Sequence, residues 1–577
     1  MADPLVTLAA RLQPAFDAVS GRTGVAPVGR RSDRADARAN GSLALAKELG
    51  RPPREVAEAV LAEALKIANL RATLEVAGPG FLNIVVHDDF LADEIAAVSS
   101  DERLGVRSAT PTRRVVVDYS APNVAKEMHV GHLRTTVIGD SLVRMLEFVG
   151  HEVIRENHIG DWGTPFGMLI EHLLDLGETE AAEHLSLGDL DGFYKQARAK
   201  FDADDTFKER SRARVVMLQG GDAETLRLWK LLVGLSTKHF NAVYERLGVL
   251  LVDDDLMGES AYNELLPQVI TRLDALGLLQ QSDGADVVFP PGYTNRDGDP
   301  LPLIVQKGTG GFNYATSDLA CVIDRIERLN ADLLLYVVGA PQAQHLSMVF
   351  DVARMAGWLA EPAQAVHVAF GSVLGSDRKM LKSRSGEPLK FIDLLDEALV
   401  RAEASVAEKN PDLGVEDRLT IARQVGIGAV KYADLSTDRV RDYVFDWDRM
   451  LSFDGNTAPY LQYAHARICS IFRRAEIDRT SLRNREPSIV EPQERALALA
   501  VLGFDSAVAD TLEKYSPHRL CTYLYDLATS FTSFYEHCPV LKADEATRLS
   551  RLVMCDVTAR VMATGLGLLG IDAPEQM

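Results

Sequence analysis

The sequence predicts a multidomain α/β protein in which a doubly wound parallel sheet lies between an N-terminal α+β domain and an all-α C-terminal domain. The chain has 577 residues, enough for roughly three or four domains of ordinary size. Apolar strands alternate with helical segments in its middle part, which is typical of βαβ units. From about residue 400 onward the strand signals fade and helical periodicity dominates.

Residues 1–108 form the expected N-terminal domain. A helical pattern covers Val56–Ile67, and a strand-like run, Phe81–Val86, follows a Gly-Pro-Gly turn. Between the first two helical runs lies a cluster of arginines, namely Arg30, Arg31, Arg34 and Arg38. A solvated loop is the simpler interpretation of this cluster. The alternative is contact with RNA phosphates.

Residues 109–405 form the expected doubly wound, Rossmann-like domain. Strands are expected at 114–120, 333–339 and 366–374, and helices at 133–149 and 344–358. Residues 165–300 are more acidic and helical, and we expect them to include a connective insertion.

Residues 406–577 form the expected helical domain, with helical runs at 419–433, 458–475, 496–512 and 549–568. Basic and aromatic residues gather in its first half: Arg467, Arg473, Arg474, Arg479, Arg483 and Arg485, near Tyr460, Tyr463 and His465. This combination suits backbone contact and stacking of unpaired bases in RNA. The alternative is a charged outer helix face.

The net charge of −21 argues at first against an RNA-binding protein. Residues 109–450 carry most of this excess, with 36 basic against 52 acidic side chains, so the two ends are close to neutral. Local arginine clusters can therefore still contact RNA. The five cysteines show no ligand spacing, and the sequence has neither a secretory signal nor a long apolar span. We expect reduced thiols, no membrane segment and a cytoplasmic protein.

The strongest motif spans residues 118–140, where a buried strand ends and His-Val-Gly-His stands at the start of the next helix. A helix N-terminus offers free N–H groups and a positive dipole end to a phosphate. His129 and His132 fall on one helical face and can donate to the same phosphate. Gly131 lets a flat base or ribose approach the backbone. The alternative is a pair of histidines that are merely capped or packed.

A second motif, Gly375–Glu387, follows the last expected strand and contains Lys379, Met380, Lys382 and Ser383. A glycine-flanked, lysine-rich loop at the C-terminal edge of a parallel sheet can fold over phosphates. Solvated lysines are the simpler interpretation of the loop alone. Its place on the same expected sheet as the first motif favours a phosphate site.

Together the two motifs resemble the two signatures of class I aminoacyl-tRNA synthetases. Other stretches narrow the resemblance to the arginyl-tRNA synthetase family, and it covers nearly the whole chain. These stretches are Ser120–Arg134, Asn157–Gly167, Gly258–Ser260, Tyr460–Ile471 and Leu566–Met577.

The resemblance implies activation of L-arginine by ATP and transfer of the arginyl group to the terminal ribose of tRNA. His129 and His132 would stabilise the charge that develops on the α-phosphate, while Lys379 and Lys382 would hold pyrophosphate. Mg²⁺ would accompany ATP, with no metal held tightly by the protein. The implied ATP site comprises Pro122, Asn123, Val124, Ala125, Lys126, Glu127, Met128, His129, Val130, Gly131, His132, Met380 and Ser383.

A guanidinium pairs best with carboxylates, so an arginine site needs acidic partners. By the resemblance, Asp118, Tyr314 and Asp318 would bind the guanidinium. Asn123 and Gln342 would position the amino and carboxylate groups, and Ser120 belongs to the same site. The alternatives are a strand-end cap for Asp118 and an N-cap or surface acid for Asp318.

Two positions depart from the family pattern. Lys382 is present although the family often lacks the second lysine, which leaves the division of work between Lys382 and Lys126 open. Pro165 stands where the family commonly has Gln, which puts a side-chain role at this position in doubt.

The implied partners are arginine-accepting tRNA, L-arginine and ATP, and the family suggests a monomer. The helical domain would bind the anticodon, and the N-terminal domain would contact the tRNA elbow. The competing interpretations are another class I ligase or a nucleotidylyltransferase with the same phosphate motifs, and an inactive paralogue that acts as an RNA-binding module.

Overall fold

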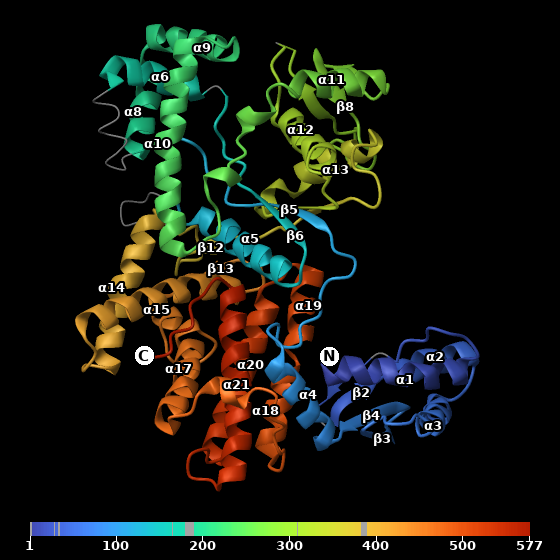
Figure 1. Cartoon of the computed structure of the whole chain (residues 1–577). Coiled ribbons are helices and arrows are strands. Elements are labelled where there is room, and N and C mark those ends of the chain that lie inside the picture. Colours follow the sequence, from blue (N-terminus) through green and yellow to red (C-terminus); the bar gives the residue numbers. More distant parts are fainter. Residues whose placement is uncertain are drawn as a thin grey trace. The chain divides into compact units, whose positions relative to one another are not determined.

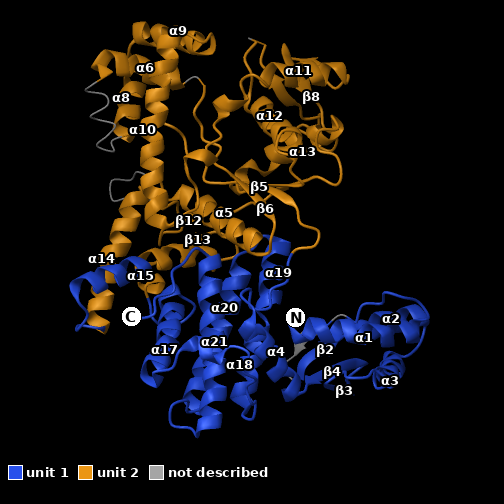
Figure 2. Ribbon diagram, viewed as in Figure 1, with its two compact units in different colours: residues 1–108, 410–425, 452–577 blue, residues 109–409, 426–451 orange. Residues whose placement is uncertain are grey.

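The computed structural model describes residues 3–27, 29–32, 35–163, 165–178, 190–308, 310–381 and 389–577 (Figure 1). The chain divides into two compact units (Figure 2). Unit 1 comprises residues 1–108, 410–425 and 452–577, and unit 2 comprises residues 109–409 and 426–451. None of the described helices combines the length and hydrophobicity that a membrane crossing requires. All five cysteines are buried and free.

The N-terminal part of unit 1 is an antiparallel sheet with four helices. Its strands have the order β1-β2-β4-β3 and are β1 (Gly29–Ser32), β2 (Ala35–Ala39), β3 (Ala72–Ala77) and β4 (Phe81–Val86). Its helices are α1 (Pro4–Ser20), α2 (Gly41–Leu49), α3 (Pro53–Ala64) and α4 (Asp88–Ser100). The turn before β4 requires glycine, because Gly80 has a φ of 137° and a Cβ there would lie 2.6 Å from the Pro53 carbonyl.

The described arginines of this cluster lie on two paired antiparallel strands, not in a loop between two helices. Arg30 and Arg31 belong to β1 and Arg38 to β2, while Arg34 lies outside the described residues. The Arg38 guanidinium lies 4.7 Å from the centroid of the Phe81 ring. A cation on an aromatic face is a structural contact, so Arg38 serves at least the packing of this sheet.

The rest of unit 1 is helical. Its elements are the first part of α15 (Val415–Leu435), α17 (Ala458–Ala475), η4 (Arg479–Leu482), α18 (Pro492–Leu502), α19 (Phe504–Lys514), α20 (His518–His537) and α21 (Glu545–Leu568). The single helix expected at 496–512 is wrong, because the chain breaks at Gly503 into α18 and α19. Glycine weakens a helix interior, which makes this the natural place for the break.

Arginines of the helical part hold the N-terminal part within unit 1. Arg495 forms ion pairs with Asp36 and Asp88, and Arg560 donates to the carbonyl oxygens of Ser99 and Asp101 at 2.6 and 2.8 Å. These charge-assisted bonds join the two parts beside the packed pair α4 and α18.

Unit 2 is built on a parallel sheet of strand order β11-β10-β5-β6. The strands are β5 (Arg114–Asp118), β6 (Glu152–Glu156), β10 (Leu333–Tyr336) and β11 (Gln364–His367). Strand β6, which follows β5 along the chain, pairs with one edge of β5, and the later strand β10 pairs with the other edge. The carboxyl ends of β5 and β10 therefore form a topological switch point, the usual ligand crevice of such sheets.

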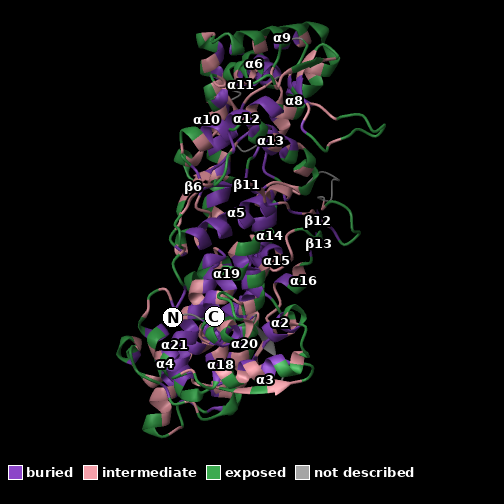
Figure 3. Cartoon of the chain, turned by 90° about the vertical axis from the view of Figure 1, so that its right-hand side faces the viewer, coloured by how far each residue is buried: buried purple, intermediate pink, exposed green. Residues whose placement is uncertain are grey.

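Helices α5 (Gly131–Phe148) and α13 (Ala343–Met355) follow the expected alternation, and α12 (Tyr314–Glu327) precedes β10. Helix α5 is buried along most of its length (Figure 3). It packs so closely beyond β5 that a Cβ at Gly139 would lie 2.3 Å from the Tyr119 ring. This close packing fixes the start of α5 beside the switch point.

The strand expected at 366–374 is wrong as one element. The chain forms β11 and then β12 (Val373–Leu374), which pairs with β13 (Tyr443–Val444) in a separate ladder. Between them Gly371 approaches the backbone of Arg441 so closely that a Cβ would lie 2.8 Å from its carbonyl carbon. The turn therefore follows from a distant contact that the apolar run does not show.

The segment expected as an acidic, helical insertion contains α6 (Pro165–Leu176), α8 (Leu190–Ala203), α9 (Asp205–Gln219), α10 (Ala223–Leu247), η1 (Asp253–Asp255), η2 (Glu259–Tyr262) and α11 (Leu266–Ala275). An antiparallel sheet that the sequence did not predict follows α11. Its strands are β7 (Gln280–Ser282), β8 (Ala285–Val288) and β9 (Leu303–Gln306), and β9 lies just beyond the expected segment. The remaining elements of unit 2 are η3 (Ala340–Gln342), α14 (Phe391–Lys409), the rest of α15, and α16 (Trp447–Met450).

Candidate active site

The loop from β5 to α5 crosses the switch point in an unusual backbone conformation. Ser120, Ala121 and Ala125 have φ values of 75°, 46° and 58°. The loop is held by side chains, since Thr135 Oγ1 accepts from the Ser120 N–H at 3.0 Å and Ser236 Oγ accepts from the Ala125 N–H at 2.9 Å. Left-handed non-glycine residues persist only where their surroundings enforce them, and they concentrate at functional sites.

The two histidines of the first signature are fixed in one tautomer by the backbone. The Gly131 N–H donates to His129 Nδ1 at 3.0 Å, and the His129 N–H donates to His132 Nδ1 at 3.1 Å. A neutral imidazole whose Nδ1 accepts must carry its proton on Nε2. Both rings, 4.1 Å apart between centroids, therefore have an Nε2–H donor.

Both histidines are neutral at physiological pH. Burial lowers the pKa of His129, and it lowers the pKa of His132 to about 3, with the Lys126 charge acting in the same direction on both.

Gly131 also makes room for a neighbouring side chain. A Cβ at this position would lie 2.7 Å from Cε1 of His129, so the absent side chain makes room for the histidine ring. The glycine is needed for the arrangement of the two histidines.

The structure describes the first part of the second signature, up to Leu381. Lys379 and Met380 are exposed at the end of a tight turn, where the Gly375 N–H donates to the Lys379 carbonyl at 2.8 Å. Lys382 and Ser383 lie outside the described residues. The chain is described again at Leu389, whose carbonyl accepts from the Val130 N–H at 3.0 Å.

Two further contacts join this returning segment to the first signature. The Phe391 N–H donates to the Met128 carbonyl at 2.9 Å, and Lys390 forms an ion pair with the buried Glu127 at 2.9 Å. The segment that follows the second signature, residues 389–391, is thus anchored on the first signature.

A cavity of about 350 Å³ adjoins the loop. Four residues of the sequence-based site line it, namely Asn123, Val124, Lys126 and Tyr314. The other lining residues include Gly160, Trp162, Pro165, Tyr194, Gln219, Glu259, Lys307 and Ser317. Asp118, His129, His132, Asp318, Gln342, Lys379 and Met380 are not among the residues that line it.

The expected arginine-binding pair lies at the first turn of α12. Tyr314 is the first residue of the helix, with 72% of its surface exposed, and Asp318 follows one turn later. His345 of α13 faces Asp318, with 2.5 Å between Nε2 and Oδ2, and this contact raises the pKa of His345. Gln342 is exposed at the end of η3, just before α13.

Asp118 is already paired inside the protein. Its Oδ2 accepts from Arg325 at 2.8 Å, and the same guanidinium contacts Glu156 at 2.6 Å. Arg325 is fully buried and lies 4.7 Å from the centroid of the Tyr336 ring. One carboxylate oxygen of Asp118, the residue that the resemblance places in the arginine site, is thus already bonded to an internal arginine.

Ser120 is also engaged internally. Its buried Oγ lies 2.7 Å from the Tyr244 hydroxyl and accepts from Thr136 Oγ1 at 3.0 Å. The hydroxyl holds the loop against α5 and α10.

Glu259 is a candidate that residue-level reasoning missed, although it stands in the Gly258–Ser260 stretch of the resemblance. It lines the cavity with Tyr314, and burial raises its pKa to about 7, with the Asp161 and Asp318 charges acting in the same direction. A carboxyl group with a pKa near 7 is partly protonated at neutral pH, and a bound cation favours its charged form. No local sequence signal reveals this burial.

The described residues contain no group of three or more histidine, cysteine or acidic side chains that is suited to hold a metal ion. Mg²⁺ usually keeps several waters and binds through substrate phosphates with one or two carboxylates. A site for Mg²⁺ brought by ATP would therefore need only one or two carboxylates from the protein.

A second cavity, of about 410 Å³, lies in unit 1 and is lined by Asn410, Tyr463, Ala466, Arg467, Ser470, Arg473, Arg474, Tyr535, Gln576 and Met577. The Arg467 guanidinium lies 4.9 Å from the Tyr463 ring centroid and 5.6 Å from that of Tyr535. Half-exposed aromatic rings next to arginines are suited to an unpaired base and its phosphate.

Other members of the basic cluster have structural partners. Arg479 forms an ion pair with Asp556 at 2.6 Å, and the buried His465 lies with Nδ1 2.9 Å from the Pro574 carbonyl oxygen. Tyr460 packs against Tyr525 at 5.6 Å between centroids. Only part of the cluster therefore faces the second cavity.

The chain matches three families in succession. Residues 7–86 match the arginyl tRNA synthetase N terminal domain, residues 94–447 the tRNA synthetases class I (R) catalytic domain, and residues 461–577 the DALR anticodon binding domain. A nucleotidylyltransferase that shared only the phosphate motifs would not match all three segments.

Whole proteins show the same likeness. The chain is 54% identical to the arginine–tRNA ligase of Thermobifida fusca over 580 residues, which cover 100% of both chains. It is 49% identical to that of Klebsiella pneumoniae over 543 residues, which cover 94% of both chains. The arginyl-tRNA synthetase structures of Plasmodium falciparum and Thermus thermophilus superpose with TM-scores of 0.86 and 0.82, both at 27% identity. They cover 100% and 99% of this chain, and the chain covers 100% of each. The chain therefore belongs to the arginyl-tRNA synthetase family.

Proposed function

We propose that the protein joins L-arginine to arginine-accepting tRNA in two steps. First, a carboxylate oxygen of arginine attacks the α-phosphorus of ATP, the bond to the β-phosphate breaks, and pyrophosphate leaves. Second, a hydroxyl of the terminal ribose of tRNA attacks the arginyl carbonyl, and AMP leaves. The observation that carries the proposal is the cavity with Tyr314 and Glu259 in its wall, which directly adjoins the loop of the first signature.

The loop at the switch point would bind ATP. Its contacts would come from Pro122, Asn123, Val124, Ala125, Lys126, Glu127, Met128, His129, Val130, Gly131, His132, Met380 and Ser383. His129 and His132 would donate from Nε2 to the oxygens of the reacting phosphate, which gain charge in the transition state. Lys379 and Lys382 would hold pyrophosphate. Mg²⁺ bound to ATP would supply further neutralisation.

The arginine substrate would lie in the cavity with its guanidinium toward α12. Tyr314 offers a ring face to this planar cation, and the carboxylates of Asp318 and Glu259 supply negative charge. Asp118 would add charge at the end of β5 while Arg325 holds it in place. Asn123 and Gln342 would position the amino and carboxylate groups, and Ser120 would support the loop that carries Asn123.

Binding of tRNA would use both ends of the chain. The cavity around Arg467 and Tyr463 would take an anticodon base, and the N-terminal domain would contact the tRNA elbow. In this division, residues 1–108 contact tRNA, residues 109–405 catalyse, and residues 406–577 bind the anticodon. We also propose that the protein acts in the cytoplasm as a monomer.

The test is a charging assay with purified protein, ATP, total tRNA and each labelled amino acid in turn. We expect only arginine to become attached to tRNA as a base-labile ester. Charging with a different amino acid, and none with arginine, would overturn the proposed specificity.

A further inference from the structure

The first turn of α8 touches the ATP loop at two neighbouring residues. The Lys126 ammonium lies 4.5 Å from the centroid of the Tyr194 ring. The Glu127 N–H donates to Asp191 Oδ1 at 3.0 Å. Lys126 and Tyr194 both line the cavity beside the first signature. The insertion therefore supplies a wall of the site as well as a connection.

A lysine held by an aromatic ring differs from one held by a carboxylate in the charge that it can offer to a ligand. The attraction comes from the ring quadrupole, so the ammonium keeps its full charge and its N–H donors. A carboxylate partner would neutralise that charge and compete with a phosphate. Within the described ranges of the chain, no acidic side chain forms an ion pair with Lys126, and its contact with Tyr194 leaves it available to an anion.

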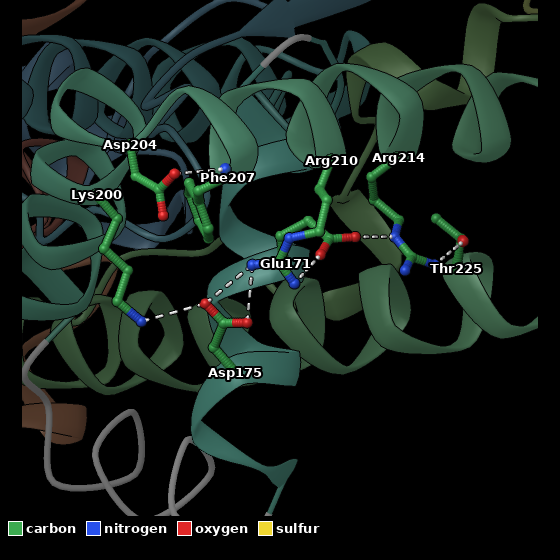
Figure 4. A network of polar contacts seen from close by, with 8 residues as sticks. All are labelled: Glu171, Asp175, Lys200, Asp204, Phe207, Arg210, Arg214 and Thr225. Atoms are coloured by element: carbon green, nitrogen blue, oxygen red, sulfur yellow. Dashed lines mark hydrogen bonds and ion pairs between the residues drawn. The ribbon is translucent and has the colours of Figure 1, made fainter.

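Helix α8 is itself held by a polar network (Figure 4). Lys200 of α8 contacts Asp175 of α6 at 3.4 Å, and Arg210 of α9 contacts the same carboxylate at 3.0 Å. Arg214 of α9 contacts the buried Glu171 at 2.7 Å and donates to Thr225 of α10 at 3.0 Å. The ring of Tyr194 is therefore presented by a packed group of helices.

We propose that Tyr194 is a positioning residue for ATP: its ring face orients the Lys126 ammonium toward a phosphate of ATP, while Asp191 fixes the backbone next to it. This inference rests on the proposed function, because it assigns a support to one residue of the proposed ATP site.

The test compares variants by arginine-dependent ATP–pyrophosphate exchange with tRNA present. Tyr194→Leu removes the ring, and we expect kcat/KM for ATP to fall by roughly 2- to 30-fold, the range that a cation–π contact supports. Tyr194→Phe keeps the face and should retain most of kcat/KM. KM for arginine should stay within about twofold in both variants. Gln196→Leu, at an exposed position of the same helix, is the matched control.

A double-mutant cycle with Lys126→Met separates positioning from general packing. If Tyr194 acts through Lys126, Tyr194→Leu has little further effect on kcat/KM for ATP in the Lys126→Met background. Tyr194→Met is the second non-aromatic variant should the leucine variant fold poorly, as judged by thermal unfolding.

Three outcomes overturn the inference. They are additive effects in the cycle, a Tyr194→Phe variant as impaired as Tyr194→Leu, and a Lys126→Met variant as active as the wild type. A wild-type protein without arginine-dependent exchange would instead overturn the proposed function. The two failures are therefore distinguishable.

Discussion

His132 is the residue whose chemistry the structure specifies most sharply. Its Nδ1 accepts from the His129 N–H, so only Nε2–H is left to donate to a phosphate. The side-chain amide nitrogen of glutamine reaches about as far as Nε2 of histidine, whereas that of asparagine reaches only about as far as Nδ1. We therefore expect His132→Gln to retain more activity than His132→Asn.

The expected magnitudes follow from one hydrogen bond made in the transition state. Such a donor is typically worth about 3 kcal/mol, or roughly 100-fold in rate. His132→Ala and His132→Asn should lose about this much in kcat. His132→Gln keeps the donor but must order a more flexible side chain, at a cost of about 1 kcal/mol, which corresponds to a loss of roughly fivefold.

The assay is the rate of arginine-dependent ATP–pyrophosphate exchange at saturating arginine and ATP, with tRNA present. Thermal unfolding of each variant serves as the control for folding. An asparagine variant equal to or better than the glutamine variant would show that Nδ1 faces the reaction, and it would refute the assigned tautomer.

Three further predictions concern the other parts of the protein. The pKa of Glu259 is about 7 and its charged form binds a cation, so KM for arginine should rise roughly tenfold when the pH falls from 8 to 6. Glu259→Gln should have a higher KM for arginine at pH 8 than the wild type, and this KM should no longer depend on pH. A variant with the same pH profile as the wild type would contradict the role of Glu259. Arg325→Met should lower the free energy of unfolding by roughly 3–5 kcal/mol, because it leaves Asp118 and Glu156 buried without their cation. Arg328 is exposed, so Arg328→Met should lower it by less than about 1 kcal/mol in the same denaturant titration. Equal losses would refute the importance of the buried network. Arg467→Ala should raise KM for tRNA roughly tenfold in charging assays. The Arg479 guanidinium is paired with Asp556, so Arg479→Ala should raise this KM less. A larger effect of Arg479→Ala than of Arg467→Ala would place the tRNA contact elsewhere.

The sequence predicted those features that depend on neighbours along the chain. The parallel strands β5 and β10, the helix after the first signature and the helix α17 follow from local periodicity, and both signatures are short contiguous motifs. The family resemblance, which rests on such motifs, is confirmed by matches over the whole chain.

Features that depend on distant contacts were missed. The split of residues 366–374 follows from the approach of Gly371 to Arg441, and the raised pKa of Glu259 follows from burial among residues of several segments. The pairing of Asp118 with Arg325 joins residues 207 positions apart. The tautomers of His129 and His132 depend on backbone geometry that no residue pattern encodes.

The roles of the site residues stay predictions until they are tested by mutation. Asp118 and Ser120 each have an internal partner that the sequence did not show, Arg325 and Tyr244 respectively.

The most direct test of the central claim is ATP–pyrophosphate exchange by the purified chain, measured with arginine and with other amino acids, each with and without arginine-accepting tRNA. The structure and the family predict exchange with arginine when tRNA is present, and none with the other amino acids. Exchange with another amino acid would contradict the specificity of the cavity around Tyr314 and Glu259. No exchange under any condition would contradict the enzyme itself and favour an inactive paralogue that only binds RNA.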